Sequence, residues 1–386
     1  MRAGARILMV AGGTGGHIFP ALAVAEALRR RGERSGHPYT IEFVGTHRPL
    51  EAKLIPAAGF RLRAVDAAGL KGIGGMKRLQ NLLVLPRTAI AVARILREFR
   101  PQVVLGVGGY LAGPVMLEAA LVNIPTVLIE PNVRPGFTNR LLAPLVRAAA
   151  VGFAETASYY GDKAHTTGLP VRRAFFGIPP PRHAPPEVAQ ALLPVPETQP
   201  GVAVSPQPFT VLVVGGSQGS VAINHAMKEA LPLLAEVTGG LRIIHQTGER
   251  DYNEIRKAYQ EQSLPAEVHA FIDDMPGTLA QADLVISRAG ATAVAELAAA
   301  GRAAVLIPFP GATDQHQLEN ARALERAGAA RVIVQSELTP ARLAKEIQEL
   351  IASPGALEGM ETSVRRLARP DAAARIADMV EHWLRR

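Results

Sequence analysis

The sequence predicts an α/β protein with two Rossmann-like domains that face a cleft. Short β-branched or aliphatic runs alternate with longer helical patterns, which is typical of parallel sheets covered by helices. Each half of the chain also opens with a strand, a glycine loop and a helix, in that order. With 386 residues, 48% of them hydrophobic, the chain exceeds the size at which a single core usually stops growing. We therefore expect two domains.

Eight apolar runs are predicted to be strands, four in each half. They are Ile7–Val10, Ile41–Val44, Val103–Val107, Thr126–Ile129, Val211–Val214, Leu241–His245, Asp283–Ser287 and Ala304–Pro308. The stretch 178–208 between the halves contains ten prolines and resists regular structure, so we expect a linker or surface excursion there.

The first glycine loop is Gly12-Gly13-Thr14-Gly15-Gly16-His17. A glycine loop between a strand and a helix lets backbone N–H groups approach a phosphate, and the helix N-terminus favours an anion. The next strand does not end in the acidic residue of a dinucleotide site, and the loop lacks the Gly-Lys-Ser/Thr of a P-loop. His17 could take a proton from an attacking hydroxyl, because its pKa lies near neutrality. The alternative is that His17 only hydrogen-bonds the loop.

A second loop, Gly106-Val107-Gly108-Gly109-Tyr110, follows another strand of the first half. It is expected to face the same crevice at the strand ends, because parallel strands end at one edge of the sheet. This loop could leave room for an acceptor, or it could be a close contact between a helix and the sheet.

Three segments of the second half carry candidate ligand contacts. The loop 215–220 matches the first glycine loop in position, and Ser287 to Thr292 precedes a helix that carries Glu296. A carboxylate there could bind a ribose diol, or it could be an ordinary charge on a helix surface. The run Asp314 to Asn320 concentrates amides and a histidine, which suits sugar hydroxyls but also a capped loop.

Net charge and composition restrict the partners. Lys plus Arg is 42 against 34 for Asp plus Glu, a formal charge of +8, which favours an anionic partner such as nucleic acid, an acidic membrane or a phosphorylated substrate. There is no cysteine, so disulfides and thiolate sites are excluded. Neither a His-Glu-x-x-His nor an Asp-x-Asp motif is present, so we expect no metal and no cofactor. No export signal or spanning segment is apparent.

Two further segments have amphipathic character. Residues 70–87 mix leucines with cations in the manner of a peripheral membrane site, although the leucines could equally pack inward. The segment 371–386 is predicted to be a helix with Ile376, Met379, Val380 and Trp383 on one stripe, which we expect to pack against the core.

In their order, these motifs resemble the MurG family, which transfers N-acetylglucosamine from its UDP derivative to the membrane-bound precursor lipid I and has the two-domain GT-B fold. The resemblance extends over nearly the whole chain. It rests on residues 12–17, 106–110, 130–132, 168–172, 215–219, 271–275, 288–291 and 314–320. Leu169 and Ala293 depart from the family pattern, where Asn and Thr are usual.

The resemblance implies a site and a domain division. The first domain would comprise residues 1–172 together with helix 371–386, and the second would comprise residues 173–370. His17 would be the catalytic base of an inverting, metal-free transfer. The substrate-binding residues would be Thr14, Gly15, Gly16, Tyr110, Asn132, Arg172, Ser217, Ile272, Ala291, Thr292, Glu296, His316 and Gln317.

It also implies partners and a location. The donor would be UDP-N-acetylglucosamine, and the acceptor would be undecaprenyl-linked lipid I, which becomes lipid II. The protein would lie peripherally on the anionic cytoplasmic face of the cell membrane, with cell-wall synthesis and division proteins as candidate partners and no nucleic acid. Two alternatives stay open: a UDP-sugar transferase with another lipid or small-molecule acceptor, and a non-catalytic nucleotide-sugar-binding protein. An NAD oxidoreductase is a distant third.

Overall fold

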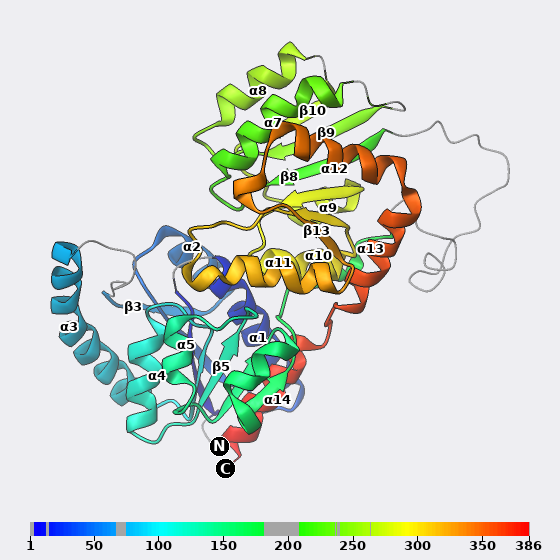
Figure 1. Ribbon diagram of the computed structural model, residues 1–386. Coiled ribbons are helices and arrows are strands. Elements are labelled where there is room, and N and C mark those ends of the chain that lie inside the picture. Colours follow the sequence, from blue (N-terminus) through cyan, green and yellow to red (C-terminus); the bar gives the residue numbers. More distant parts are fainter. Residues whose placement is uncertain are drawn as a thin grey trace. The chain divides into compact units, whose positions relative to one another are not determined.

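A computed structural model describes residues 4–12, 15–66, 75–180, 208–235, 237, 240–262 and 264–385, with the backbone alone for 75–85 and for Thr313. The contacts divide the chain into two compact units. Unit 1 holds residues 1–172 and 369–386, and unit 2 holds residues 173–368. Each unit is built around one parallel sheet (Figure 1).

Unit 1 contains a seven-stranded sheet in the order β3-β2-β1-β4-β5-β6-β7, with every neighbouring pair parallel. The order reverses between β1 and β4, the position where open α/β sheets usually bind ligands. Its strands are β1 (Arg6–Val10), β2 (Thr40–Gly45), β3 (Arg61–Ala64), β4 (Val103–Gly106), β5 (Thr126–Glu130), β6 (Ala148–Val151) and β7 (Ala164–Thr166).

Helices cover the sheet of unit 1. Those of the first domain are α1 (Gly15–Arg34), α2 (Pro49–Ala57), α3 (Gly75–Phe99), α4 (Ala112–Leu121) and α5 (Phe137–Leu142), followed by the short 3-10 turns η1 (Ala154–Tyr159) and η2 (Gly161–Lys163). One core joins strand residues such as Leu8, Val104 and Leu128 to the buried faces of α3, α4 and α5. By strand alternation, Ile7, Met9 and Leu105 point to the opposite face.

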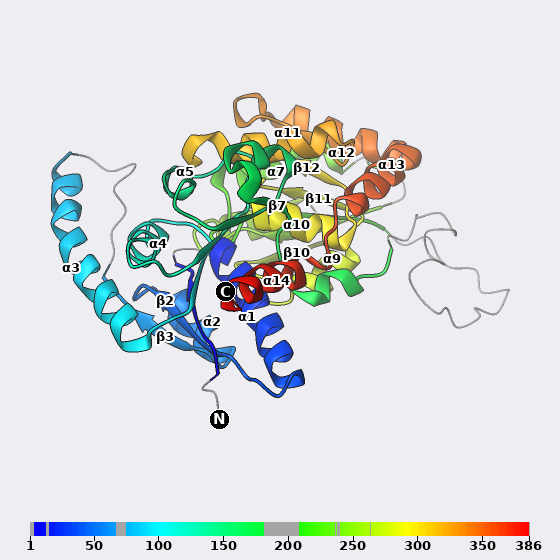
Figure 2. The same ribbon diagram turned by 90° about the horizontal axis from the view of Figure 1, so that it is seen from below.

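The last helix, α14 (Ala372–Leu384), belongs to unit 1 and packs against α1 and β4, and Figures 1 and 2 both place it beside α1. Its buried side chains are Ala372, Ile376, Ala377 and Val380. Arg31 of α1 forms ion pairs with Asp378 and Glu381 and donates to the carbonyl of Ala374 at 3.0 Å.

Unit 2 contains a six-stranded parallel sheet in the order β10-β9-β8-β11-β12-β13, which reverses between β8 and β11. The strands are β8 (Phe209–Val214), β9 (Leu241–Gln246), β10 (Ala266–His269), β11 (Leu284–Ser287), β12 (Ala304–Leu306) and β13 (Ala330–Val332). The helices are α7 (Val221–Leu234), α8 (Tyr252–Glu261), α9 (Met275–Gln281), α10 (Ala291–Ala300), α11 (His316–Arg326), α12 (Pro340–Ala352) and α13 (Pro354–Arg366), with the turns η3 (Arg173–Gly177), η4 (Thr313–Gln315) and η5 (Gln335–Glu337).

The α/β prediction is confirmed, and all eight predicted strands are present. Since α1 begins at Gly15, Pro20 lies in the second turn of this helix. There, the missing proline N–H leaves one intrahelical bond unmade. Most of the proline-rich stretch lies outside the described residues, as do residues 70–74 and the side chains to residue 85 of the predicted membrane segment.

Candidate active site

In unit 1, His17 lies against the loop that follows β4. A Cβ atom built on Gly109 would lie 3.6 Å from Cε1 of His17 and 3.2 Å from the carbonyl oxygen of Gly12. Gly109 has a positive φ of 80°, which favours glycine. The two predicted loops of unit 1 therefore meet at the switch point of the sheet, and the half-buried His17 ring stands where they meet.

Other predicted residues gather around this point. Gly15 and Gly16 form the first turn of α1, in which no acidic residue is present. The Arg172 guanidinium lies 5.2 Å from the ring centroid of Phe19 on the same helix. Tyr110 is half-buried, with the Arg48 guanidinium 5.8 Å from its ring centroid. Thr14 lies outside the described residues.

Asn132 is oriented by a buried carboxylate that the sequence analysis did not assign to the site. Oε1 of Glu130 accepts from the backbone N–H of Asn132 at 2.9 Å and from its Nδ2 at 3.1 Å. Oε2 of Glu130 accepts from the N–H of Gly136 at 3.2 Å and from Nδ2 of Asn139 at 2.8 Å. A Cβ atom on Gly108 would lie 3.0 Å from Nδ2 of Asn139, so this cluster lies directly behind the loop after β4.

Burial raises the pKa of Glu130 to about 7, although the four N–H donors act in the opposite direction. Glu130 is completely buried at the end of β5. The sequence contained a signal for it, since a charged residue directly ends an apolar strand.

In unit 2, the predicted donor-binding residues follow the ends of four strands. Ser217 is exposed on the loop after β8, and Ala291 and Thr292 begin α10 after β11. Glu296 lies four residues beyond Thr292 and so projects from the same face of that helix. No acidic residue occupies the first turn of α10, so its N–H groups suit an anion.

The remaining predicted contacts of unit 2 are partly engaged within the protein. The backbone N–H of Ile272 donates to Oε1 of Gln246 at 2.9 Å, and Nε2 of Gln246 donates to the carbonyl of Gly216 at 2.7 Å. Gln246 thus joins the Ile272 loop to the glycine loop after β8. Oε1 of Gln317 accepts from the N–H of Phe309 at 3.0 Å.

His316 and Gln317 begin α11, which follows β12. The two residues before them, Asp314 and Gln315, both have positive φ near 55°. That conformation is costly for a side-chain-bearing residue and is often found at functional sites. It sets the direction in which α11 leaves the loop.

No role was predicted for Arg288, but its side chain holds the loops of unit 2 together. Its Nη2 donates to Oγ of Ser220 and to Oε1 of Gln335, both at 2.7 Å, and its Nη1 donates to the carbonyl of Ile307 at 3.0 Å. Burial lowers the pKa of Arg288 to about 10, so the guanidinium stays charged at neutral pH. A lysine could not reach these acceptors together, because it lacks the planar fork of donors.

Comparison with known proteins agrees with this geometry. Residues 7–151 match the glycosyltransferase family 28 N-terminal domain, and residues 210–376 match the corresponding C-terminal domain. A relative from Anaeromyxobacter sp. (strain Fw109-5) is 44% identical over 99% of this chain and 94% of its own length. A second relative, from Myxococcus xanthus, is 41% identical over 98% of this chain and 94% of its own length. Both are described as UDP-N-acetylglucosamine–N-acetylmuramyl-(pentapeptide) pyrophosphoryl-undecaprenol N-acetylglucosamine transferases.

The chain belongs to the MurG family. The crystal structure of Acinetobacter baumannii MurG superposes with a TM-score of 0.73 at 28% identity and covers 98% of this chain and 99% of that one. The glycosyltransferase of kitacinnamycin shares the fold alone, at 19% identity and a TM-score of 0.69 over 99% of both chains. The protein is thus a glycosyltransferase with the two-domain GT-B architecture of MurG.

Proposed function

We propose that this protein transfers N-acetylglucosamine from UDP-N-acetylglucosamine to the C4 hydroxyl of the muramoyl sugar of lipid I and so forms lipid II. The observation that carries the proposal is the identity of 44% along the whole chain with a relative described as this transferase. The structure supports it, because the family's motifs lie at the switch points of both sheets, where α/β proteins bind ligands.

The placement of His17 where the two loops of unit 1 meet supports its proposed role as the catalytic base. The acceptor C4 oxygen attacks the anomeric carbon of the donor from the face opposite UDP while His17 takes the hydroxyl proton. The new C–O bond forms as the bond to the diphosphate breaks, and UDP leaves with the electron pair. Configuration at the anomeric carbon is inverted. A histidine suits this role, because its pKa lies near the working pH.

Unit 2 would hold the donor. The loop with Ser217 and the start of α10 with Ala291 and Thr292 would bind the diphosphate, and Glu296 would accept from the ribose hydroxyls. The hydrogen bonds within the protein refine two of the expected contacts. Since the N–H of Ile272 is taken by Gln246, its carbonyl is the backbone group left for uracil. Since Oε1 of Gln317 holds Phe309, its amide nitrogen is left for the sugar.

The test is transfer of labelled sugar from UDP-N-acetylglucosamine to a lipid I analogue, with chelator present and with UDP-glucose and UDP-galactose as controls. Chelator-resistant transfer that is selective for the N-acetylglucosamine donor would support the proposal. If the protein bound UDP but transferred no sugar to lipid I, the proposed donor site would stand and lipid I would be ruled out as the acceptor. The second candidate, a transferase with another lipid or small-molecule acceptor, would then be preferred.

The acceptor's lipid requires a membrane surface, and we place that surface on α4 and α5 at the cytoplasmic face of the cell membrane. These helices pack together and expose large apolar side chains, with Leu121 71% exposed and Phe137 51% exposed. Leu117 and Leu141 on the two helices are also exposed, as are Val122 and Leu145 just beyond their C-terminal ends. Exposed arginines Arg134 and Arg147 lie near this apolar surface in the sequence and favour anionic lipid.

None of the helices in the described part of the chain is long and apolar enough to cross a membrane. Co-sedimentation with vesicles of anionic and of neutral lipid tests the surface. The double variant Leu121→Glu with Leu141→Glu should lose most binding to anionic vesicles and keep UDP binding. Unchanged vesicle binding by this variant would move the membrane contact to another part of the protein.

A further inference from the structure

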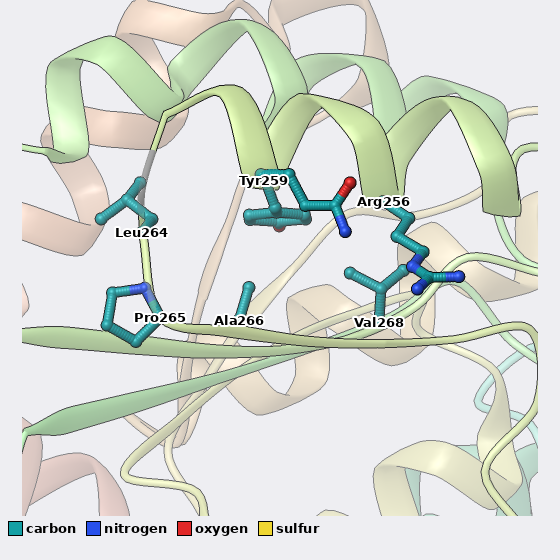
Figure 3. A pocket seen from close by; sticks show the side chains of 7 residues that line it. Arg256, Tyr259, Leu264, Pro265, Ala266 and Val268 are labelled. Carbon is teal, nitrogen blue, oxygen red and sulfur yellow. The ribbon is translucent and has the colours of Figure 1, made fainter.

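A buried chain of three polar side chains lies behind the glycine loop that follows β8. Nε2 of His245 on β9 is 3.1 Å from Oδ1 of Asn224 on α7, and Nδ1 of His245 is 3.0 Å from the hydroxyl of Tyr259 on α8. His245 and Asn224 are completely buried, and Tyr259 is nearly so. Figure 3 shows Tyr259 on the underside of α8, facing the strand that carries Ala266 and Val268, where it lines a hollow of about 500 Å³.

The donor and the acceptor of each hydrogen bond among these three side chains are fixed. Nδ2 of Asn224 donates both its hydrogens, to the carbonyl of Thr247 at 2.9 Å and to Oδ2 of Asp251 at 2.8 Å. A flipped amide would point its oxygen at these two acceptors, so the orientation is fixed. Oδ1 of Asn224 must therefore accept, and Nε2 of His245 carries the ring proton. Nδ1 of His245 then has a lone pair, to which the Tyr259 hydroxyl donates.

The carbonyl that Asn224 holds is in direct contact with the glycine loop. A Cβ atom on Gly219 would lie 1.7 Å from the carbonyl oxygen of Thr247, and a Cβ atom on Gly248 would lie 2.2 Å from the carbonyl oxygen of Gln218. Both glycines have positive φ. The two loops thus touch backbone to backbone, and a shift of Thr247 would displace the loop that carries Ser217.

Packing alone does not explain three polar groups in this place. Apolar side chains of similar volume would usually fill a core at no cost in stability, whereas a partly satisfied polar chain is expensive. The core of this unit also contains apolar residues such as Ile243, Ile255 and Met227. What the polar chain adds is a single hydrogen-bonded geometry that ends at the Thr247 carbonyl.

We propose that Tyr259, His245 and Asn224 form a positioning chain that sets loop 215–219 for the diphosphate of the nucleotide donor. The inference rests on the proposed function, because that function assigns the donor diphosphate to this loop. None of the three side chains touches the donor. Their effect should therefore appear in donor affinity and leave the proton transfer at His17 unchanged.

The test combines calorimetric titration of UDP with steady-state kinetics on the full-length protein. Tyr259→Phe removes one donor and should raise the Kd for UDP and the KM for the sugar donor about 5-fold, with kcat within about 2-fold. His245→Leu should raise both constants by roughly 10-fold or more. His245→Gln offers a donor and an acceptor in the same order and should recover most of the loss. Leu357→Ala, in the core at α13, is the control for general destabilisation.

The outcomes separate this inference from the proposed function. UDP affinity that is unchanged in both Tyr259→Phe and His245→Leu would overturn the positioning chain, as would an equal loss of affinity in Leu357→Ala. If the wild-type protein bound UDP but transferred no sugar to lipid I, the proposed function would fall while the predicted changes in UDP affinity would still support the chain. A wild-type protein that failed to bind UDP would overturn both.

Discussion

In unit 1, the loop after β4 lies against Asn139, which donates a hydrogen bond to the buried Glu130. In unit 2, the glycine loop after β8 lies against Thr247. The carbonyl of Thr247 accepts from Asn224, which in turn accepts from the buried His245. Burial acts on both titratable groups but in opposite directions. It raises the pKa of Glu130 to about 7 and lowers the pKa of His245 to about 3. The support of unit 1 can therefore change its charge near neutral pH, while the support of unit 2 stays neutral throughout the working range.

This difference predicts that the two units respond differently to pH. The loop beside His17, the proposed base, lies near Glu130, whose pKa is close to neutral, and the loop proposed to bind the donor rests on His245, which stays neutral. The pH dependence of the reaction should accordingly arise from unit 1, and donor affinity should vary little with pH through the buried groups of unit 2.

Removal of His17 is the strongest test of this difference between the units. His17→Ala should lower kcat by roughly 100-fold or more, since a general base contributes about that factor. UDP affinity should change less than about 3-fold, because we propose that unit 2 holds the nucleotide. Single-turnover kinetics and calorimetry measure the two quantities. A normal kcat would remove the histidine from the mechanism and would leave unit 1 without its proposed base.

The stability of the two units should depend on pH in opposite directions. The folded pKa of Glu130 is raised above its ordinary value of 4.5, so Glu130 contributes stability that is present at low pH and is lost as pH rises through about 7. The folded pKa of His245 is lowered from 6.5 to about 3, so its contribution is present above 6.5 and is lost as pH falls. As the pH rises from 5 to 7.5, titration of Glu130 should lower the free energy of unfolding by on the order of 2 kcal/mol, and titration of His245 should raise it by about the same amount.

Unfolding by denaturant at pH 5 and pH 7.5 tests these slopes. Relative to Glu130→Gln, the wild-type unit 1 should lose about 2 kcal/mol over this rise in pH, and relative to His245→Gln, unit 2 should gain about the same. The one tryptophan, Trp383, lies on α14 and reports on unit 1 by fluorescence. Hydrogen exchange of β9 follows unit 2. If the free energy of unfolding changed equally with pH in the wild type and in a variant, the replaced residue would not titrate as its burial implies.

A smaller effect than that of His17 is expected at Arg288. Arg288→Lys keeps the charge but loses the fork that joins Ser220, Gln335 and Ile307. The KM for the sugar donor should rise about 10-fold with kcat nearly unchanged, because donor loops are loosened and the base is untouched. Arg342→Lys, an exposed arginine on α12, is the matched control. A drop in kcat at constant KM would contradict the role of Arg288 in holding the proposed donor loops together.

The sequence predicted the fold class and the strands that are long and β-branched, because burial on both faces gives them continuous apolar runs. It missed β6 and β13, whose residues are Ala-Ala-Ala-Val and Ala-Arg-Val, because alanine favours helices and only neighbouring strands make these segments extended. It also missed β3, β7 and β10, which are short strands at sheet edges and contain charged or polar residues.

The loops of the site were predicted because glycine clusters after apolar runs have few other uses. The supports in unit 2 were not, because His245 and Arg288 reach their partners across 14 to 68 positions of sequence, whereas the partners of Glu130 lie within nine residues of it. Arg288 bonds to residues 68 and 47 positions away, and no local pattern indicates such a pair. What a buried charged residue holds becomes evident only once the strands lie side by side.

The position of α14 has a consequence for synthesis on the ribosome. This helix closes onto α1 and β4 of unit 1, yet in the chain it follows all of unit 2. While unit 2 is still emerging, the face of α1 that α14 will cover stays open to water or to chaperones. Domains usually fold in their order of synthesis, but here the first to start is the last to be completed. Unit 1, whose synthesis starts first, therefore stays incomplete until residues 372–384 have left the ribosome.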